Sequence, residues 1–325
     1  MMADDRESLF GNLLFSAPNN LGGLYAIMAD GRMEHLDERG TCGIRRAADG
    51  RLLRAVQQGD ILSVTDDAGT REFTGDWSDL HDVLLDGADA YFVSTRDNAV
   101  IRWNTHEEKE TERWVFSDQE DAWHINCLGW LRKELCFTAF GEFPITRGYK
   151  ADSRERGFLR RLQRNRNLSL IAGLSQPHTI LECGDEWFLC NSENGEIWHG
   201  HGHDGPQPII ALDGYTRGLA IRDGVLYAGL SASRNVVDDA HPARARIVAI
   251  DRSDWREISR IDLPSMEVYD ILALPDAGNF LHLVTRILIH ERVRLLRQRN
   301  AAAEKLATVV NENVRLKLCL GIPTS

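Results

Sequence analysis

GLAIRDGVLYA, residues 218–228, contains the pattern from which the fold can be predicted. A short apolar run, Gly218–Ile221, leads through the pair Asp223-Gly224 into a second apolar run, Val225–Ala228. An Asp-Gly pair between two such runs is the sequence signature of a β-hairpin. This stretch therefore predicts two antiparallel strands joined by a tight turn.

The same pattern recurs along the chain. Its other copies begin at Gly43, Asp82, Asn126, Thr179 and Asp270, and the starts are separated by roughly 39 to 53 residues, close to the period of a propeller blade. Each unit has room for two further strands, which would make a four-stranded antiparallel blade. We therefore predict an all-β fold, a six-bladed β-propeller over residues 1–280. An irregular β-sandwich or a barrel is the alternative that the hairpins leave open.

The two ends of the chain suggest how the ring closes. Residues 13–16, 24–27 and 33–36 read as three strands that lack a first one, whereas the run at Asp270 reads as a first strand that lacks the others. Joining them into one blade would leave no exposed sheet edge for another chain to pair with. The sequence thus predicts one blade built from both ends.

Residues 284–318 differ from the rest, because the stretch from 284 to 317 has no Gly or Pro and is rich in Leu, Arg, Ala and Glu. We predict a helix here. Spacings of four and three alternate along Ile289, Val293, Leu296, Asn300, Ala303, Ala307, Val310 and Val314. This is the heptad pattern of a coiled coil, in which an Asn at a core position fixes register. Two interpretations stay open: a homo-oligomer formed through this helix, or an amphipathic helix packed on its own propeller.

Charge and composition limit the classes of partner and the compartment that we expect for this protein. The formal net charge is −11, which argues against nucleic acid as a partner. No apolar run approaches the roughly 18 residues that a membrane helix needs, and the acidic start Met1–Arg6 lacks a secretory signal. The six cysteines form no C-x-x-C motif, and four lie in apolar strand-like runs. We therefore expect a cytoplasmic protein without nucleic-acid or membrane partners.

Candidate site residues follow from the repeat, because the residues just before each first strand should converge at the propeller axis. They are His81 and Asp82, His124 and Asn126, Gln176 and His178, Arg217, and Glu267, Tyr269 and Asp270. The plain alternative for each is a bond to a neighbouring loop carbonyl. The ends of second strands add two further candidates, Glu142 and Arg234.

We expect His124, His178 and Arg217 to share one axial pocket that binds a small anionic molecule. The histidines suit acid–base catalysis near neutral pH, or the binding of a divalent metal cation together with carboxylates. Arg217 suits a carboxylate, so Arg217→Ala should weaken binding of an anionic ligand by about 2 kcal/mol. The alternative is an internal ion pair of Arg217 with Asp82, Glu267 or Asp270.

Several segments are not explained by the blade repeat. They are Trp123–Asn126, Phe140–Phe143 with Arg147–Tyr149, Ser175–His178, Gly214–Leu219 and Gly229–Arg234. Over roughly residues 12–275 they resemble the DUF4915-type propellers, a family of bacterial proteins of unknown function. The resemblance implies the propeller fold and a shared site, and it carries no activity.

Three functions fit these features. The first is an enzyme of the lyase, lactonase or epimerase type, metal-assisted and acting on an anionic sugar or another carboxylate. The second is a non-catalytic glycan- or protein-binding scaffold, multimerised by the helical tail. The third is a purely structural interaction module.

Overall fold

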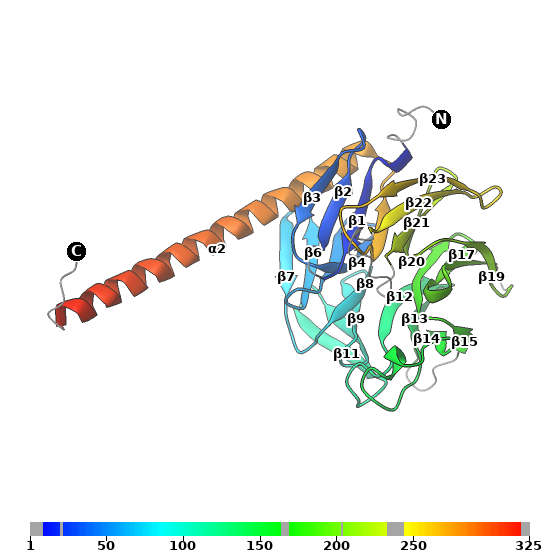
Figure 1. Ribbon diagram of the computed structural model, residues 1–325, viewed down its shortest axis with the longest axis horizontal. Helices are drawn as coiled ribbons and strands as arrows, with labels where there is room; N and C mark the ends of the chain where they lie inside the picture. Colours follow the sequence, from blue (N-terminus) through cyan, green and yellow to red (C-terminus); the bar gives the residue numbers. More distant parts are fainter. Residues whose placement is uncertain (1–8, 20–21, 164–168, 203, 233–243, 320–325) are drawn as a thin grey trace, which may run out of the picture.

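The computed structural model describes residues 9–19, 22–163, 169–202, 204–232 and 244–319, with the side chains of the last helix described as far as Val309. Six four-stranded antiparallel sheets form a six-bladed β-propeller, from which the helix α2 (Ala277–Cys319) projects (Figure 1). The predicted fold class and the number of blades are confirmed.

Each blade runs outward from an inner strand near the axis to an outer strand at the rim. The first three, in that order of strands, are β24 (Asp270–Ala273), β1 (Leu13–Ala17), β2 (Gly23–Ile27) and β3 (Met33–Asp37); β4 (Thr41–Arg46), β5 (Leu52–Val56), β6 (Ile61–Asp66) and β7 (Gly69–Phe73); and β8 (Leu80–Asp86), β9 (Asp89–Ser94), β10 (Ala99–Asn104) and β11 (Lys109–Val115). The other three are β12 (Ile125–Leu131), β13 (Glu134–Ala139), β14 (Gly157–Arg161) and β15 (Ser169–Leu174); β16 (Pro177–Cys183), β17 (Glu186–Asn191), β18 (Glu196–His201) and β19 (Gln207–Ala211); and β20 (Tyr215–Arg222), β21 (Val225–Ser231), β22 (Arg246–Asp251) and β23 (Glu257–Asp262). Two short 3₁₀ turns, η1 (Gly148–Lys150) and η2 (Ser192–Asn194), lie in loops.

One blade joins the two ends of the propeller sequence, as predicted. Strand β1 pairs antiparallel with β24, so that Phe15 lies opposite Ile271. The amide of Tyr269 donates to the carbonyl of Ser16, which extends this ladder by one bond. All five residues of β1 are buried, because Leu13 and Phe15 pack in one apolar cluster on one face of the blade and Leu14 packs in another on the opposite face. The ring therefore closes through backbone hydrogen bonds between distant parts of the chain.

Helix α2 begins at Ala277, ahead of the predicted start at residue 284. The Asp276 side chain accepts a hydrogen bond from the amide of Asn279, which caps the helix start. Gly278 and Asn279 are poor helix formers, which is why the sequence pattern predicts a later start. Burial of Phe280 in the apolar cluster that includes Leu14 outweighs that preference. Within the described residues, no helix combines the length and apolar character needed to cross a membrane.

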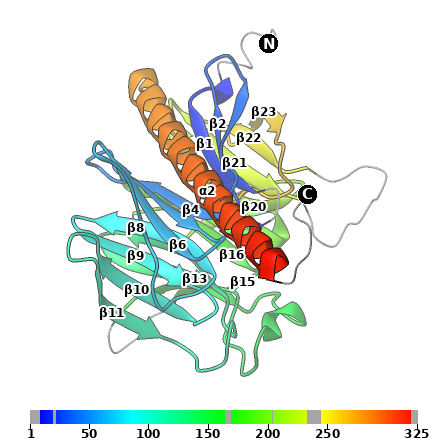
Figure 2. The same cartoon turned by 90° about the vertical axis from the view of Figure 1, so that its left-hand side faces the viewer.

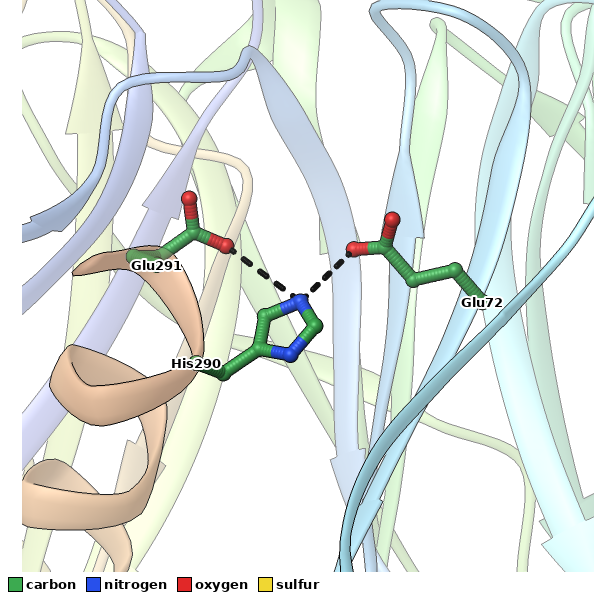
Figure 3. Close-up of side chains that lie close together, drawn as sticks. All are labelled: Glu72, His290 and Glu291. Atoms are coloured by element: carbon green, nitrogen blue, oxygen red, sulfur yellow. Dashed lines mark hydrogen bonds and ion pairs between the residues drawn. The ribbon is translucent and has the colours of Figure 1, made fainter. Parts of the chain in front are cut away.

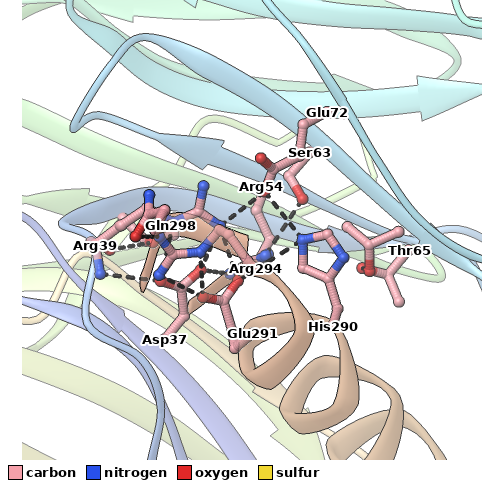
Figure 4. A network of polar contacts seen from close by, with 12 residues as sticks. Asp37, Arg39, Arg54, Ser63, Thr65, Glu72, His290, Glu291, Arg294 and Gln298 are labelled. Carbon is pink, nitrogen blue, oxygen red and sulfur yellow. Dashed lines mark hydrogen bonds and ion pairs between the residues drawn. The ribbon is translucent and has the colours of Figure 1, made fainter. Parts of the chain in front are cut away.

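A polar network fixes the first half of α2 to the propeller (Figure 4). The guanidinium of Arg39 donates to Asp37, Glu72 and Glu291, at 2.8, 2.7 and 2.8 Å. Arg54, which is fully buried, donates to the same Asp37 carboxylate at 2.7 Å. The two arginines hold the pKa of Asp37 well below its usual value, although burial alone would raise it. The helix is thus anchored by charge as well as by apolar contact.

Candidate functional site

The segments that precede the inner strands surround a cavity of about 1170 Å³. All six blades contribute to it. Its wall includes the rings of Phe140, Tyr149, Tyr215 and Tyr269 among many polar groups. A large concave site of this kind, with aromatic surface and converging polar groups, is the usual form of a small-molecule site.

The predicted site residues fall into separate places. His124, Gln176 and Arg217 line the cavity. His178 lies behind its wall, only 1% exposed, against the rings of Phe140, Tyr215 and Tyr269. Asp82, Asn126 and Asp270 are also buried and do not line the cavity.

The two candidates from the ends of second strands have no described place in the cavity wall. Glu142 is exposed, forms an ion pair with Arg160 and does not line the cavity. Arg234 lies outside the described residues.

His124 forms a dyad with Asp121. Its Nδ1 atom is 2.8 Å from Asp121 Oδ1, and a carboxylate can only accept, so Nδ1 carries the proton. Burial lowers the pKa of His124, and the hydrogen bond to Asp121 opposes this shift. The ring is therefore neutral at pH 7, with the Nε2 lone pair available as a base. Sequence reasoning missed Asp121, although it lies only three residues before His124.

Asp121 also holds the loop between β13 and β14, which forms one side of the cavity. The second carboxylate oxygen accepts from Arg147 Nε at 3.0 Å and from the Tyr149 hydroxyl at 2.9 Å. The rings of Phe140 and Tyr149 lie 4.3 and 4.4 Å from the ring of His124, between centroids. The imidazole is thus oriented by one hydrogen bond and two aromatic contacts.

Arg217 is 8% exposed and pairs with Glu267, with 2.9 Å between Nη1 and Oε2. Of the two alternatives from the sequence, an internal ion pair is therefore present, and Glu267 is the partner. Its Nε atom is nevertheless buried without a hydrogen-bond partner in the described structure. The guanidinium also lies 4.9 and 5.8 Å from the ring centroids of Tyr215 and Tyr269. Arg217 thus lines the cavity as a paired cation, and its unused Nε donor is buried in the wall.

Two further histidines have a similar local arrangement to His124. His81 Nδ1 lies 3.0 Å from the carbonyl of Asp79, and His178 Nδ1 lies 3.0 Å from that of Gln176. Because carbonyls only accept, both rings carry a proton on Nδ1. Burial, with the nearby Arg217, brings the pKa of His178 well below its usual value, and its Nε2 is buried without a partner among the described residues. Three consecutive blades therefore each place a histidine near the axis with its Nδ1 proton held by the protein.

We expect nuclear magnetic resonance to show His124 and His178 as neutral Nδ1–H tautomers at neutral pH. The acceptors at Nδ1 and the lowered pKa of each ring require this state. Correlation spectra of the imidazole nitrogens measure it, and the variants His124→Gln and His178→Gln assign the signals. An Nε2–H tautomer or a charged ring at either position would contradict the hydrogen bonding described above.

The sequence predicts a metal site at His124 and His178. Among the described residues, they belong to no group of three His, Cys, Asp or Glu whose ligand atoms all lie within 4.8 Å. Such a group does occur at Glu72, His290 and Glu291 (Figure 3). There, Arg39 already donates to both carboxylates, so its positive charge occupies the position that a cation would need. The axial metal remains a prediction.

A second charged cluster lies buried near the axis. Arg45 pairs with Asp270, and its other nitrogen lies 3.5 Å from Asp82. Burial raises the pKa of Asp270 to about 7, with Asp82 adding to the shift and Arg45 opposing it. Each carboxylate also accepts backbone amides, including those of Leu128 and Ile44. These two predicted site residues therefore join four inner strands, β4, β8, β12 and β24, and Arg45 is a further polar residue that sequence reasoning missed.

Comparison with solved structures shows the fold. Regucalcin from Agrobacterium tumefaciens strain C58, described as a calcium-binding protein, is 13% identical with a TM-score of 0.54, over 73% of this chain and 79% of that chain. A chain of the nidogen–laminin complex is 12% identical with a TM-score of 0.58, over 81% and 98%. A luciferin-regenerating enzyme is 11% identical with a TM-score of 0.51, over 71% and 78%. Identities this low support a common architecture and no common activity.

No curated protein matches the chain. The family model described as a domain of unknown function, DUF4915, matches residues 67–281. This range covers most of the propeller, from β7 to the first turn of α2. It includes the Asp121–His124 dyad and Arg217, and the chain belongs to the DUF4915 family.

Proposed function

We propose that the axial cavity binds a small anionic molecule and that His124, oriented by Asp121, acts on it as a general acid–base. The observation that carries this proposal is the dyad at 2.8 Å on a residue that lines a polar cavity. A neutral imidazole whose far nitrogen is held by a carboxylate can take up a proton and is stabilised once it is charged.

Three cationic groups can bind an anion here, although six carboxylates also line the cavity, among them Asp60, Asp79 and Glu193. Lys150 and Arg154 line the cavity and are exposed, and neither has a carboxylate partner among the described residues. Arg217, with its unpartnered Nε, supplies a third cationic group deeper in the wall. The carboxylates of Asp121 and Glu267 are each satisfied by protein donors. A carboxylate of the ligand can therefore be attracted by Lys150, Arg154 and Arg217.

This arrangement suits proton removal next to a bound carboxylate. That step is common to lyases and epimerases acting on sugar acids, and the same base can activate water against a lactone. The aromatic rings on the wall provide flat apolar surface for a sugar ring. Because the described residues bring no third ligand close to both His124 and His178, the proton transfer is assigned to the dyad alone.

The test is a binding series on the purified full chain. We expect glucuronate and galacturonate to raise the melting temperature, and the corresponding neutral sugars to raise it much less, because Arg217 selects the carboxylate. Arg217→Ala should lose about 2 kcal/mol of uronate binding, or about 30-fold in Kd by calorimetry. Arg246→Ala is the control, since Arg246 pairs with Asp213 and does not line the cavity.

Equal binding of neutral and acidic sugars, or an unchanged Kd in Arg217→Ala, would remove the anionic ligand from the proposal. A non-catalytic binding scaffold is the second candidate, favoured by the exposed helix α2. Uronate binding without turnover, unaffected by His124→Gln, would assign the protein to that class.

A further inference from the structure

We propose that α2 pairs with α2 of a second copy of this chain as a parallel, two-stranded coiled coil, through the helix face opposite the propeller. This proposal does not depend on the ligand of the axial cavity. It rests on the exposure of the helix, on which of its faces the propeller covers, and on the residues of the uncovered face.

From Leu295 to Val309, the described part of the outer helix is exposed and has no ion pair with the propeller. The helix has 43 residues, hence a length of roughly 64 Å, and extends beyond the propeller (Figures 1 and 2). Its last ion pairs with the propeller, among the described residues, involve His290 and Glu291. Every side chain from Leu295 to Val309 is exposed. A helix without tertiary contacts is marginal in water, so this part needs a partner.

The uncovered face is apolar and has a defined direction. Phe280, Leu283, Val284, Ile287 and Glu291 are buried against the propeller and mark one side of the helix. Successive residues of a helix are about 100° apart around its axis. The heptad positions therefore centre on a direction about 180° from the buried face, and each lies within about 40° of that direction. The described members of this seam are Ile289, Val293, Leu296, Asn300, Ala303 and Ala307. Two copies can therefore join along it with their propellers on the outside.

The residue types at the heptad positions of the seam favour a parallel dimer. Val293 and Asn300 occupy a positions and Leu296 a d position, the combination that favours two parallel strands. Two Asn300 side chains face each other only when the helices are parallel and in register, and elsewhere each would lie against apolar groups. Arg299 of one copy then lies opposite Glu304 of the other copy, at the edge of the seam, and the two charges attract each other. Arg292 and Arg297 form the corresponding repulsive pair one heptad nearer the propeller, which limits the affinity.

Two adjacent leucines provide a matched test. Leu296 lies in the seam and Leu295 about 100° away from it, and their exposed fractions are 48% and 51%. We expect sedimentation velocity over a concentration series to show a monomer–dimer equilibrium for the full chain and for Leu295→Glu, and only monomer for Leu296→Glu. Because neither side chain is packed on the propeller, both variants keep the fold, which circular dichroism checks.

Each result either supports or overturns the pairing. A full chain that stays monomeric at every concentration overturns the proposal, as does a dimer that Leu295→Glu breaks and Leu296→Glu does not. Capture of the helix by a different protein while the chain alone is monomeric also overturns it. Orientation is tested with Asn300→Cys in a Cys319→Ser background: a parallel, in-register pair gives an interchain disulfide under mild oxidation, whereas an antiparallel pair gives none.

Discussion

Replacing Arg45 with methionine is expected to destabilise the propeller by about 3–5 kcal/mol at about pH 8, and by much less at about pH 4. The side chain of Arg45 is 18% exposed, and it separates two buried carboxylates, Asp82 and Asp270. Its removal leaves two like charges facing each other without a counterion. Because these three residues join inner strands of three blades, the loss affects the centre of the ring.

The pH dependence follows from the direction of the pKa shifts. Burial already raises the pKa values of Asp82 and Asp270 above the ordinary carboxyl value, and Arg45 opposes both shifts. Without Arg45 the folded-state values rise further, so the native state binds more protons than the unfolded state. Stability then falls as the pH rises from about 4 through the folded pKa values, and it returns on acidification.

Urea unfolding of the wild type and of Arg45→Met at three pH values measures this difference in the free energy of unfolding. Arg32→Met is the control, because Arg32 forms an exposed ion pair with Asp30 and should not change the unfolding midpoint measurably. A difference for Arg45→Met that is the same at acid and alkaline pH would show that the two carboxylates are not its source.

The parts of the fold that the sequence could predict are those set by local chemistry. Asp-Gly turns between apolar runs specify hairpins at residues 49–50, 86–87 and 223–224, and five hairpins with a sixth inner strand at Asp270 predict six blades. The predicted start of α2 is too late because Gly278 and Asn279 disfavour a helix locally, whereas the burial of Phe280 depends on contacts with β-strands far away in the sequence. Closure of the ring could be predicted because incomplete strand sets at the two ends match.

The candidate site likewise contains residues whose position could be predicted from the sequence and residues whose position could not. Position at or just before the start of an inner strand brought His124, Gln176 and Arg217 to the cavity, because the repeat fixes where those residues lie. Position in the repeat did not distinguish side chains that reach the cavity from those that are buried behind its wall, as His178, Asp82, Asn126 and Asp270 are. That difference depends on the direction of each side chain after a residue with positive φ, such as Gln176 at 49°.

Asp121→Asn is expected to lower kcat by about 10²–10⁴-fold on any substrate that the cavity turns over, with KM changed little. Asp121 fixes the Nδ1 proton of His124 and stabilises the imidazolium that forms when Nε2 takes up a proton. An asparagine of the same shape can present its amide NH₂ to Nδ1, which favours the wrong tautomer. The substrate is still held by Arg217, so binding should remain.

The pH profile separates this role from a structural one. In the wild type, kcat/KM should fall on the acid side with an inflection below 6.5, because burial lowers the pKa of His124. The hydrogen bond to Asp121 raises that pKa, so its loss should move the inflection to still lower pH while the plateau drops.

Tyr149→Phe and Arg147→Gln are the matched controls, because each removes one of the loop contacts to Asp121 and leaves the dyad intact. A merely structural role for Asp121 predicts that these variants lose as much activity as Asp121→Asn, with all three inflections unchanged. A catalytic dyad predicts small losses for the two controls, and an acid-side shift only when the carboxylate itself is replaced. His124→Gln should abolish the acid limb altogether, since no other lining histidine has a carboxylate at the same distance from Nδ1 among the described residues.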